Sequence, residues 1–325
     1  MLPTRASKRV RNQLVPGTAI SSAVKWRAIT IAKDDSAGAV FSSTGCALIA
    51  QLRANESGAL AGQDPEYLHQ LRVTVRRLRA ILSLYSALLR GRERKSAARE
   101  LKWLAFALGP ARDSDVFIHD IWPPLHELLG HGALVEALNA EWLAQQRRNT
   151  RAAHRALASR RYQRMVHEQE LWFSAQSWRA HANRSERAAW DQHAQKFARH
   201  ELGRRAERTR SYGRVLGDMD AAALHRLRIK IKKLRYVMDT VSPLFKHTKV
   251  KEMLESLSNL QDTLGAMHDV AVAVQKIDAA LPKLKRIDTG QLRRQIAAWQ
   301  ALRSKILKRK LNPAWHTFRH AKPFW

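Results

Sequence analysis

HQLRVTVRRLR, the segment His69–Arg79, returns later in the chain as HRLRIKIKKLR, the segment His225–Arg235. The two copies are separated by 225 − 69 = 156 residues. A second pair of segments, LGPARD at Leu108–Asp113 and LGAMHD at Leu264–Asp269, has the same offset, because 264 − 108 is also 156. Two matches in one register, with no net insertion between them, predict an internally duplicated unit.

Read as α-helices, the two copies each place one imidazole and three cations within an arc of about 80°. The face of the first copy carries His69, Arg72, Arg76 and Arg79. The face of the second copy carries His225, Arg228, Lys232 and Arg235. We call these faces the first rail and the second rail. Duplicated units commonly pack about a pseudo-twofold axis, so we expect the two rails to face each other across one site.

Beside each rail lies an apolar stripe that predicts burial against a core. The first stripe contains Leu68, Leu71, Val75, Leu78 and Leu82. The second stripe contains Leu224, Leu227, Ile231, Leu234 and Met238. The central rail cations have no carboxylate three or four residues away within their own helix to neutralise them. Cations that share a helix face repel one another, and this arrangement indicates a bound anion.

The composition supports a polyanion as the partner. The 325 residues include 58 Lys and Arg against 28 Asp and Glu, a formal charge of +30, and 45% are hydrophobic, enough for a folded core. Nucleic acid, an anionic membrane surface or an inorganic polyanion fits that charge. Cys46 is the single cysteine, which excludes an intramolecular disulfide and fits a reducing compartment. Apolar runs of about 20 residues and a secretory h-region are absent, so we expect a cytoplasmic protein.

Apolar positions recur every three to four residues almost throughout, which predicts an all-α fold. We expect a flexible basic N-terminal arm over residues 1–36 and a helical domain over 37–325. The domain is predicted to comprise two four-helix-bundle-like halves, at about 37–210 and 211–325, related by pseudo-twofold symmetry around a basic central cleft or pore.

Several helix limits can be predicted from local signals. A first helix is expected at about residues 40–58, and Asp64-Pro65-Glu66 predicts the start of the first basic helix, which runs to about Leu89. The next helix is predicted from about residue 93 to 121 and ends before Pro123-Pro124. A last pair of helices is expected after the turn at Leu281-Pro282.

These motifs together resemble the CHAD domain family, the conserved-histidine α-helical domains. HxxRxxxRRxR followed by LGxxRDxDV occurs here at His69–Arg79 and Leu108–Val116, and related segments follow at Leu224–Tyr236 and Leu260–Val270. The closing KPFW, Lys322–Trp325, is also similar to the end of such domains. The resemblance covers roughly residues 40–325.

The resemblance implies two helical halves with the basic helices lining a central cleft or pore, and it implies binding of inorganic polyphosphate without catalysis. Such domains are often fused to a triphosphate-tunnel domain, but we find no ExExK signature and expect a stand-alone module on polyphosphate granules. We expect no metal and no cofactor. The predicted polyphosphate-binding residues are His69, Arg72, Arg76, Arg77, Arg79, Lys102, Arg112, His225, Arg228, Lys232, Lys233 and Arg235.

Polyphosphate is a flexible chain with roughly one charge per phosphate, and Arg forks and Lys point charges suit its oxygens. A neighbouring polyanion favours protonated histidine, so we predict binding that tightens below about pH 7 and weakens with salt. The second half is poorer in cations, because Ser258 and His268 stand where the first half has Lys102 and Arg112.

Other interpretations remain. A charge of +30 would bind nucleic acid nonspecifically, although recognised nucleic-acid motifs and interleaved aromatic residues are absent. An enzyme is not expected, because no carboxylate cluster, P-loop or metal-ligand spacing occurs. Asp113, Asp115 and Asp269 could form a metal pair or orient neighbouring arginines. Gly109 and Gly265 are predicted to allow close helix packing. The arginines between residues 147 and 164 could extend the anion path or form a solvated face.

Overall fold

The computed structural model describes residues 22–32, 34–89, 91–180, 182–283 and 289–325. The chain is 84% helical and has no strand in this part, as predicted. The helices in chain order are α1 Ala37–Ala54, α2 Glu56–Ala61, α3 Pro65–Leu84, α4 Arg92–Val116, α5 Trp122–Leu129, α6 Ala133–Leu157, α7 Arg160–Ser174, α8 Arg184–Asp191, α9 Ala194–Tyr212, α10 Ala221–Val241, α11 His247–Ala280 and α12 Gly290–His320. A π-helix, Phe117–Ile121, connects α4 to α5.

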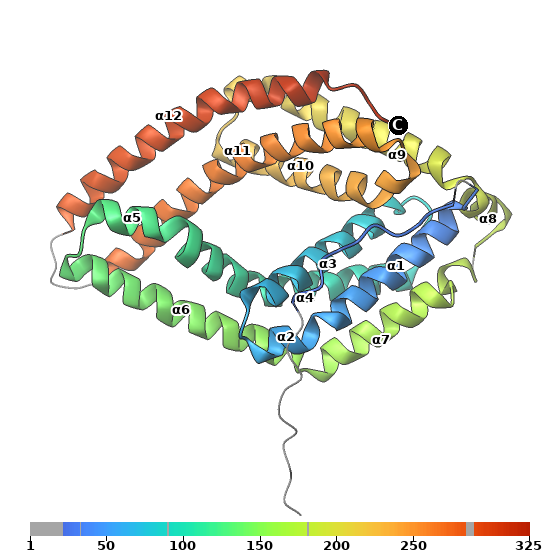
Figure 1. Cartoon of the computed structure of the whole chain (residues 1–325), viewed down its shortest axis with the longest axis horizontal. Coiled ribbons are helices and arrows are strands. Elements are labelled where there is room, and N and C mark those ends of the chain that lie inside the picture. Colours follow the sequence, from blue (N-terminus) through green and yellow to red (C-terminus); the bar gives the residue numbers. More distant parts are fainter. Residues whose placement is uncertain (1–21, 33, 90, 181, 284–288) are drawn as a thin grey trace, which may run out of the picture.

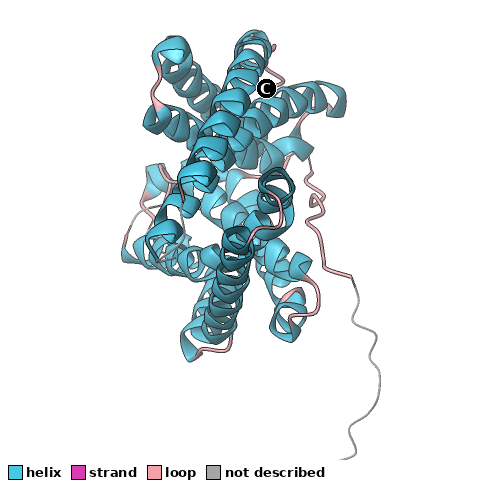
Figure 2. Cartoon of the chain, turned by 90° about the vertical axis from the view of Figure 1, so that its left-hand side faces the viewer, coloured by secondary structure: helices cyan, strands magenta, loops and turns pink. Residues whose placement is uncertain are grey.

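The helices form two groups, which Figure 1 shows as α1–α7 below and α9–α12 above. Seen from one end of the molecule, the same two groups lie one over the other (Figure 2). In the first group α3 packs on α1 and α4, and α4 packs on α6. In the second group α10 packs on α9 and α11, and α11 packs on α12. The groups meet in the middle of the molecule, where α3 packs directly on α10.

The order of helices repeats at nearly the interval of the sequence motifs. Helices α1, α3, α4 and α6 begin at residues 37, 65, 92 and 133, and α9, α10, α11 and α12 begin at 194, 221, 247 and 290. Each pair is therefore separated by 155–157 residues. This spacing is what a duplication predicts. The same spacing pairs α9 with α1, while the boundary between two halves at about residue 210 stays a prediction.

Both basic helices begin at an aspartate cap. The Asp64 carboxylate accepts a hydrogen bond from the Glu66 amide at 2.7 Å, and Pro65 occupies the first turn of α3, as predicted. At the start of α10 the Asp220 carboxylate accepts one from the Ala223 amide at 2.6 Å. The first apolar stripe is buried throughout, and in the second stripe only Leu224 is half-buried. These stripes fix which face of each helix carries the rail.

The two groups meet again at the end of the molecule that contains α5. Phe117, Trp122 and Trp142 of the first group form one apolar cluster with residues of α11 and α12, among them Ile277 and Ile296. This cluster is separate from the main core, which contains both apolar stripes. The two groups are thus fixed to each other both at the rails and at this end.

Three sequence predictions need correction. Pro123-Pro124 does not end the helical path, because both prolines occupy the first turn of α5, where a missing amide costs no hydrogen bond. Among residues 289–325 one helix, α12, replaces the predicted last pair. The first helix is shorter than expected, because Asn55 ends α1 and a second short helix, α2, follows.

The predicted N-terminal arm over residues 1–36 also has a shorter limit. Residues 1–21 lie outside the described residues, but Val24 lies against α1. Its amide donates to the Asn55 side chain at 2.9 Å, and its carbonyl accepts from Gln51 and Asn55. The Trp26 side chain packs against the main core. The packed part of the chain therefore starts well before residue 37.

In the described part of the chain, no helix is both long enough and apolar enough to cross a lipid bilayer.

A substitution at Gly45 of α1 tests the packing of α1 against α7. A Cβ atom at this position would lie 2.0 Å from the buried Phe173 ring of α7. We expect Gly45→Ala to lower the free energy of unfolding by about 1–3 kcal/mol through overpacking. Gly265→Ala is the matched control, since its Cβ meets nothing within 4 Å and alanine favours the helix. Urea unfolding measures both, and a Gly45→Ala protein as stable as the wild type would contradict the α1–α7 contact.

Candidate anion-binding site

The two rails come together where α3 packs on α10, as the sequence predicts. Residues of both helices, with part of α4, line a cleft of about 730 Å³. The basic residues of this cleft are Arg76, Arg79, Arg94, Lys102, Lys232 and Lys233. Among the described residues that line the cleft there is no carboxylate. The arrangement concentrates positive charge from both groups in one space.

Several rail guanidinium groups contain a buried nitrogen without a partner. The Nε atoms of Arg72, Arg76 and Arg228 are buried, and none has a hydrogen-bond partner among the described residues. The Nδ1 atom of His69 is also buried and also has no hydrogen-bond partner among the described residues. A buried donor without an acceptor costs about 1–3 kcal/mol, so these groups are poised to donate to an added acceptor.

The ionisation of the site reflects its unbalanced charge. Burial, followed by repulsion from Arg228, Arg76 and Arg72, lowers the pKa of Lys232 to about 8. The arginines named here belong to both rails, so the two rails act electrostatically on one another across the α3–α10 contact. Burial, Arg228 and His225 likewise lower the pKa of His268 to about 4. Positive charge thus dominates the space between the rails.

Asp113 of α4 supplies the principal counter-charge. Its Oδ1 atom lies 3.1 Å from the NH2 atom of Arg72, and 70% of the carboxylate side chain is exposed. Asp115, by contrast, is buried and accepts a hydrogen bond from Gln146 at 2.9 Å. Asp269 is half-buried beside Arg228, and burial raises the pKa of its carboxyl group. Asp113 therefore orients a rail arginine as predicted, while Asp115 has a different partner.

The two predicted packing glycines differ. A Cβ atom at Gly109 would lie 3.1 Å from the NH1 atom of Arg72, so this glycine leaves room for a rail guanidinium. A Cβ atom at Gly265 would meet nothing within 4 Å. Close approach therefore explains Gly109, and the prediction for Gly265 is wrong because its surroundings are open.

Arg77 has a structural contact that the sequence did not predict. Its NH2 atom lies 2.9 Å from Asp239 Oδ2, with only 11% of the arginine side chain exposed. Its guanidinium carbon also lies 5.4 Å from the Trp26 ring centroid. This residue ties α3 to α10 and to the N-terminal segment. Its Nε and NH1 atoms are buried without a hydrogen-bond partner among the described residues, so its assignment as a phosphate ligand stays a prediction beside this interhelix ion pair.

The remaining predicted residues are members of the rails or lie near them. Besides Arg77, six predicted residues are not part of the cleft lining: His69, Arg72, Arg112, His225, Arg228 and Arg235. Arg79, Lys102 and Lys233 are exposed and line the cleft. The charge of Arg112 lowers the pKa of His69, after the larger effect of burial, so these two side chains are neighbours. The ring centroids of His225 and His268 are 5.0 Å apart. Arg235 is half-buried.

Tyr236 and Arg94 are among the cleft residues that the predicted set did not contain. Tyr236 lies between the rails, with the guanidinium carbon of Arg76 at 5.5 Å from its ring centroid. It directly follows the second basic repeat, which could have indicated it. Arg94 lies outside both repeats, so only the fold places it in the cleft. A smaller hollow of about 270 Å³ shares Ser83 and Lys233 with the cleft and adds arginines of α9.

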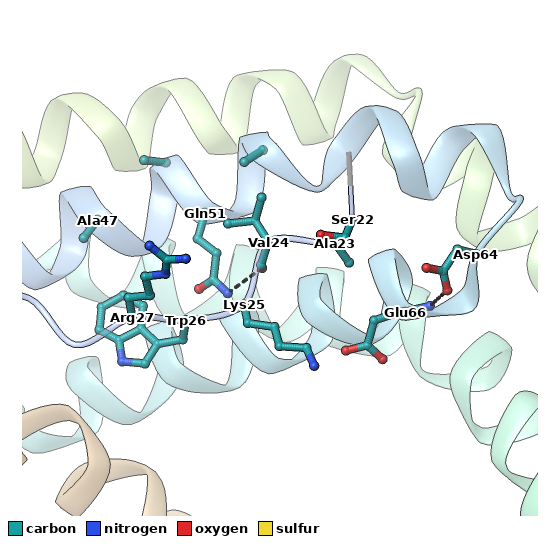
Figure 3. A pocket seen from close by; sticks show the side chains of 12 residues that line it. Ser22, Ala23, Val24, Lys25, Trp26, Arg27, Ala47, Gln51, Asp64 and Glu66 are labelled. Carbon is teal, nitrogen blue, oxygen red and sulfur yellow. Dashed lines mark hydrogen bonds between the residues drawn. The ribbon is translucent and has the colours of Figure 1, made fainter. Parts of the chain in front are cut away.

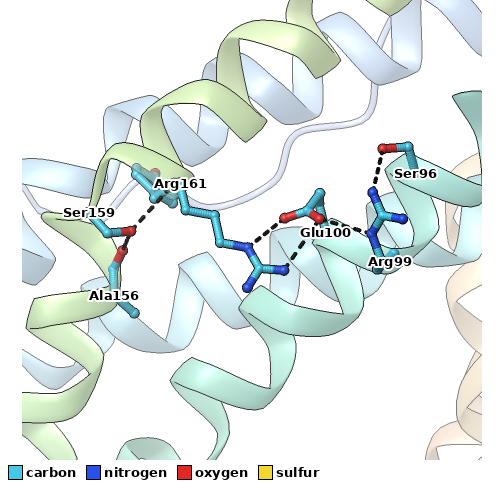
Figure 4. A network of polar contacts seen from close by, with 7 residues as sticks. Ser96, Arg99, Glu100, Ala156, Ser159 and Arg161 are labelled. Atoms are coloured by element: carbon cyan, nitrogen blue, oxygen red, sulfur yellow. Dashed lines mark hydrogen bonds and ion pairs between the residues drawn. The ribbon is translucent and has the colours of Figure 1, made fainter.

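The arginines between residues 147 and 164 lie on α6 and α7 and contribute nothing to the cleft lining. Arg161 Nε lies 2.8 Å from Glu100 Oε2, an ion pair between α7 and α4 (Figure 4). Its guanidinium carbon also lies 4.2 Å from the Trp103 ring centroid. Arg148 pairs with Glu141 at 3.0 Å. These contacts favour the interpretation as a solvated face.

A second hollow, of about 850 Å³, lies between the N-terminal segment and helices α1 and α3. Figure 3 shows Asp64 and Glu66 at one end and Trp26 and Arg27 at the other. Its charges are mixed, so it offers no concentrated field for an anion. The smaller cleft between the rails is therefore the better candidate site.

Comparison with known proteins agrees with this geometry. A family profile described as "CHAD domain" matches residues 46–278. The chain belongs to the CHAD domain family. That family is linked in general to polyphosphate binding.

Two solved structures are similar to this CHAD protein. A crystal structure of the CHAD domain from the plant Ricinus communis has a TM-score of 0.76 and 25% identity, with 92% of this chain and 97% of that chain covered. PptA from Streptomyces chartreusis has a TM-score of 0.60 and 16% identity, with coverage of 88% and 99%, and it supports the fold alone. No curated protein sequence matches the chain.

The buried charge of Lys232 is predicted to lower the free energy of unfolding. Its folded-state pKa of about 8 lies below its ordinary value of 10.5, so burying the charged amine is a cost below pH 8. That cost disappears as the pH rises from about 8 towards 10.5. We expect Lys232→Met to raise the free energy of unfolding by about 1–2 kcal/mol at pH 7 and by much less at pH 10.

Urea unfolding at the two pH values measures this effect. The exposed neighbour Lys233 provides the control, because Lys233→Met removes the same charge without relieving burial. A Lys232→Met protein that is less stable than Lys233→Met at pH 7 would contradict the electrostatic cost.

Proposed function

We propose that this CHAD protein binds inorganic polyphosphate between the two rails and holds it without cleaving it. The observation that carries the proposal is the set of buried guanidinium nitrogens of Arg72, Arg76 and Arg228 that have no hydrogen-bond partner among the described residues. Phosphate oxygens are acceptors that match arginine donors in geometry and in charge.

The shape and charge of the cleft fit a flexible polyanion. Its basic residues come from α3, α4 and α10, and it adjoins the smaller hollow, which shares Ser83 and Lys233 with it and contains Arg204, Arg208 and Lys230. A polyphosphate chain carries charge at every phosphate and bends easily, so it can follow such a path through successive contacts. This adjacency supports a chain of many phosphates as the ligand rather than a single phosphate.

The pH response is expected to involve both lysine and histidine. Polyphosphate stabilises the charged form of Lys232, whose pKa is about 8 in the free protein, so affinity is expected to fall above that pH. Burial and Arg112 lower the pKa of His69 in the free protein. The gain in affinity from its protonation is therefore expected at a lower pH than the sequence suggested.

Nonspecific nucleic-acid binding is the second candidate, and the net charge of +30 is the observation that favours it. Against it, Tyr236 is the one aromatic side chain among the described residues that line the cleft, and the guanidinium groups of Arg76 and Arg77 lie over its ring. Stacking on bases needs free aromatic faces. We therefore favour polyphosphate, and we propose association with polyphosphate granules as the cellular role.

Competition between the two polyanions tests the proposal. We expect the wild type to retain long-chain polyphosphate at near-physiological salt in the presence of excess double-stranded DNA. We expect the variant Arg72→Ala/Arg76→Ala/Arg228→Ala/Lys232→Ala to bind polyphosphate at least tenfold more weakly, with affinity that depends less on salt because fewer counterions are released.

A matched variant removes four charges elsewhere. Arg151→Ala/Arg155→Ala/Arg160→Ala/Arg164→Ala affects exposed residues of α6 and α7 and should bind nearly as the wild type does. Circular dichroism checks that both variants stay helical, and released orthophosphate is assayed in every sample. Equal losses in the two variants, or easy displacement by DNA, would favour a diffuse basic surface. Orthophosphate release would indicate an enzyme.

A substitution at Gly109 tests whether binding depends on the position of the Arg72 guanidinium. A methyl group at this position would crowd the NH1 atom of Arg72, which is the mobile end of a long side chain. We expect Gly109→Ala to fold normally but to bind polyphosphate several-fold more weakly, because Arg72 is displaced. Gly265→Ala, the same change at the corresponding position of the second half, should leave affinity unchanged. Binding isotherms compare the two, and equal affinities would argue against a role for Arg72.

A further inference from the structure

The segment Asp113–Gln146 differs in composition from the rest of the chain. It contains no Lys or Arg, although a stretch of 34 residues would carry about six at the chain's average of 58 in 325. It contains six carboxylate residues and three histidines. In a protein of formal charge +30, this segment is therefore suited to a cation rather than to an anion.

Three of its side chains converge where α5 passes into α6. His126 lies in the last turn of α5, His131 in the loop between the helices, and Glu136 in the first turn of α6. One ligand atom from each lies within 4.8 Å of the other two. Glu136 Oε1 is 3.2 Å from His126 Nε2 and 3.5 Å from His131 Nδ1.

The two histidine–carboxylate distances are close to the distances between ligands in a zinc coordination sphere. Zn²⁺ binds imidazole nitrogen and carboxylate oxygen at about 2.0–2.1 Å, so neighbouring ligands of a tetrahedral site lie about 3.3–3.4 Å apart. Two imidazoles and one carboxylate form a ligand set that zinc enzymes and related transition-metal sites use. We propose that His126, His131 and Glu136 bind a divalent transition metal of the Zn²⁺ class.

The surroundings hold the ligands in place. The His126 ring packs edge-on against Trp122 at a centroid distance of 5.7 Å, and Trp122 is buried and donates to the Asn139 side chain. The backbone turns through Gly130, whose φ of 78° favours glycine. This turn brings His131 back over His126, with ring centroids 5.0 Å apart. Two rigid helices and a tight turn thus define the ligand geometry.

The site leaves room for further ligands, and nearby cations do not oppose it. The side chains of His131 and Glu136 are 79% and 51% exposed, so a fourth coordination position faces solvent. Two cations of the neighbouring helices have their own contacts. Lys276 Nζ lies 4.4 Å from the Phe117 ring centroid, and Arg293 NH1 lies 3.6 Å from Asp278. The site lies on α5 and α6, apart from the rails of α3 and α10, and the inference does not depend on the proposed function.

Calorimetric titration of the untagged, EDTA-treated full chain with ZnCl₂ tests the inference. We expect one strong site in the wild type and binding at least tenfold weaker in His131→Ala and in Glu136→Gln. A thermal scan should show a rise in melting temperature with Zn²⁺ that both variants lose. Co²⁺ in place of Zn²⁺ should give intense visible absorption if the coordination is tetrahedral.

Control variants separate this site from other histidines. His316 and His320 stack on α12 with ring centroids 4.1 Å apart, so His316→Ala/His320→Ala removes a competing pair and should retain the strong site. Glu127→Gln removes an exposed carboxylate of α5 outside the triad and should also retain it. If the wild type takes up no Zn²⁺, or if its strong site persists in both His131→Ala and Glu136→Gln, the proposal is wrong and the triad is a histidine–carboxylate ion-pair cluster.

Discussion

Repulsion between the cations of α3 and α10 is the constraint on which the rest of the structure depends. Apolar stripes hold the two helices in contact against it, since a fully buried Leu or Ile such as Leu71 or Ile231 contributes about 1.5–3 kcal/mol. The Arg77–Asp239 ion pair bridges the same interface with both partners largely buried. Packing thus holds charges together that would otherwise separate.

The long helices connect the rails to the apolar cluster near α5. Helix α11 spans 34 residues, about 50 Å, and contains both His268 beside the second rail and Ile277 in the apolar cluster near α5. Helix α4 and the π-helix that follows it connect the first rail to the same cluster. Each rail is therefore anchored at a distance from the charges, where apolar contacts meet no electrostatic opposition.

Sequence periodicity predicted the helical class, the aspartate cap of α3 and the meeting of the rails, because these depend on local spacing and on repetition. It could not distinguish Arg76 from Arg77, because a rotation of one residue about the helix decides which guanidinium meets Asp239. Nor could it place Arg94 in the cleft, since that residue lies outside the repeats. Composition averaged over 325 residues also concealed the segment Asp113–Gln146, where the local charge is reversed.

The exposed carboxylate of Asp113 beside Arg72 would compete with an anion that binds at the rails as proposed. Tethered at 3.1 Å from the guanidinium, it competes with any incoming anion at a high effective concentration. A single small anion gains one contact and must displace this resident charge to obtain it. A long polyanion makes many contacts at once, and the displacement of one carboxylate is a minor fraction of its binding energy. If anions bind at the rails as proposed, Asp113 would therefore favour ligands with many linked charges over single small anions.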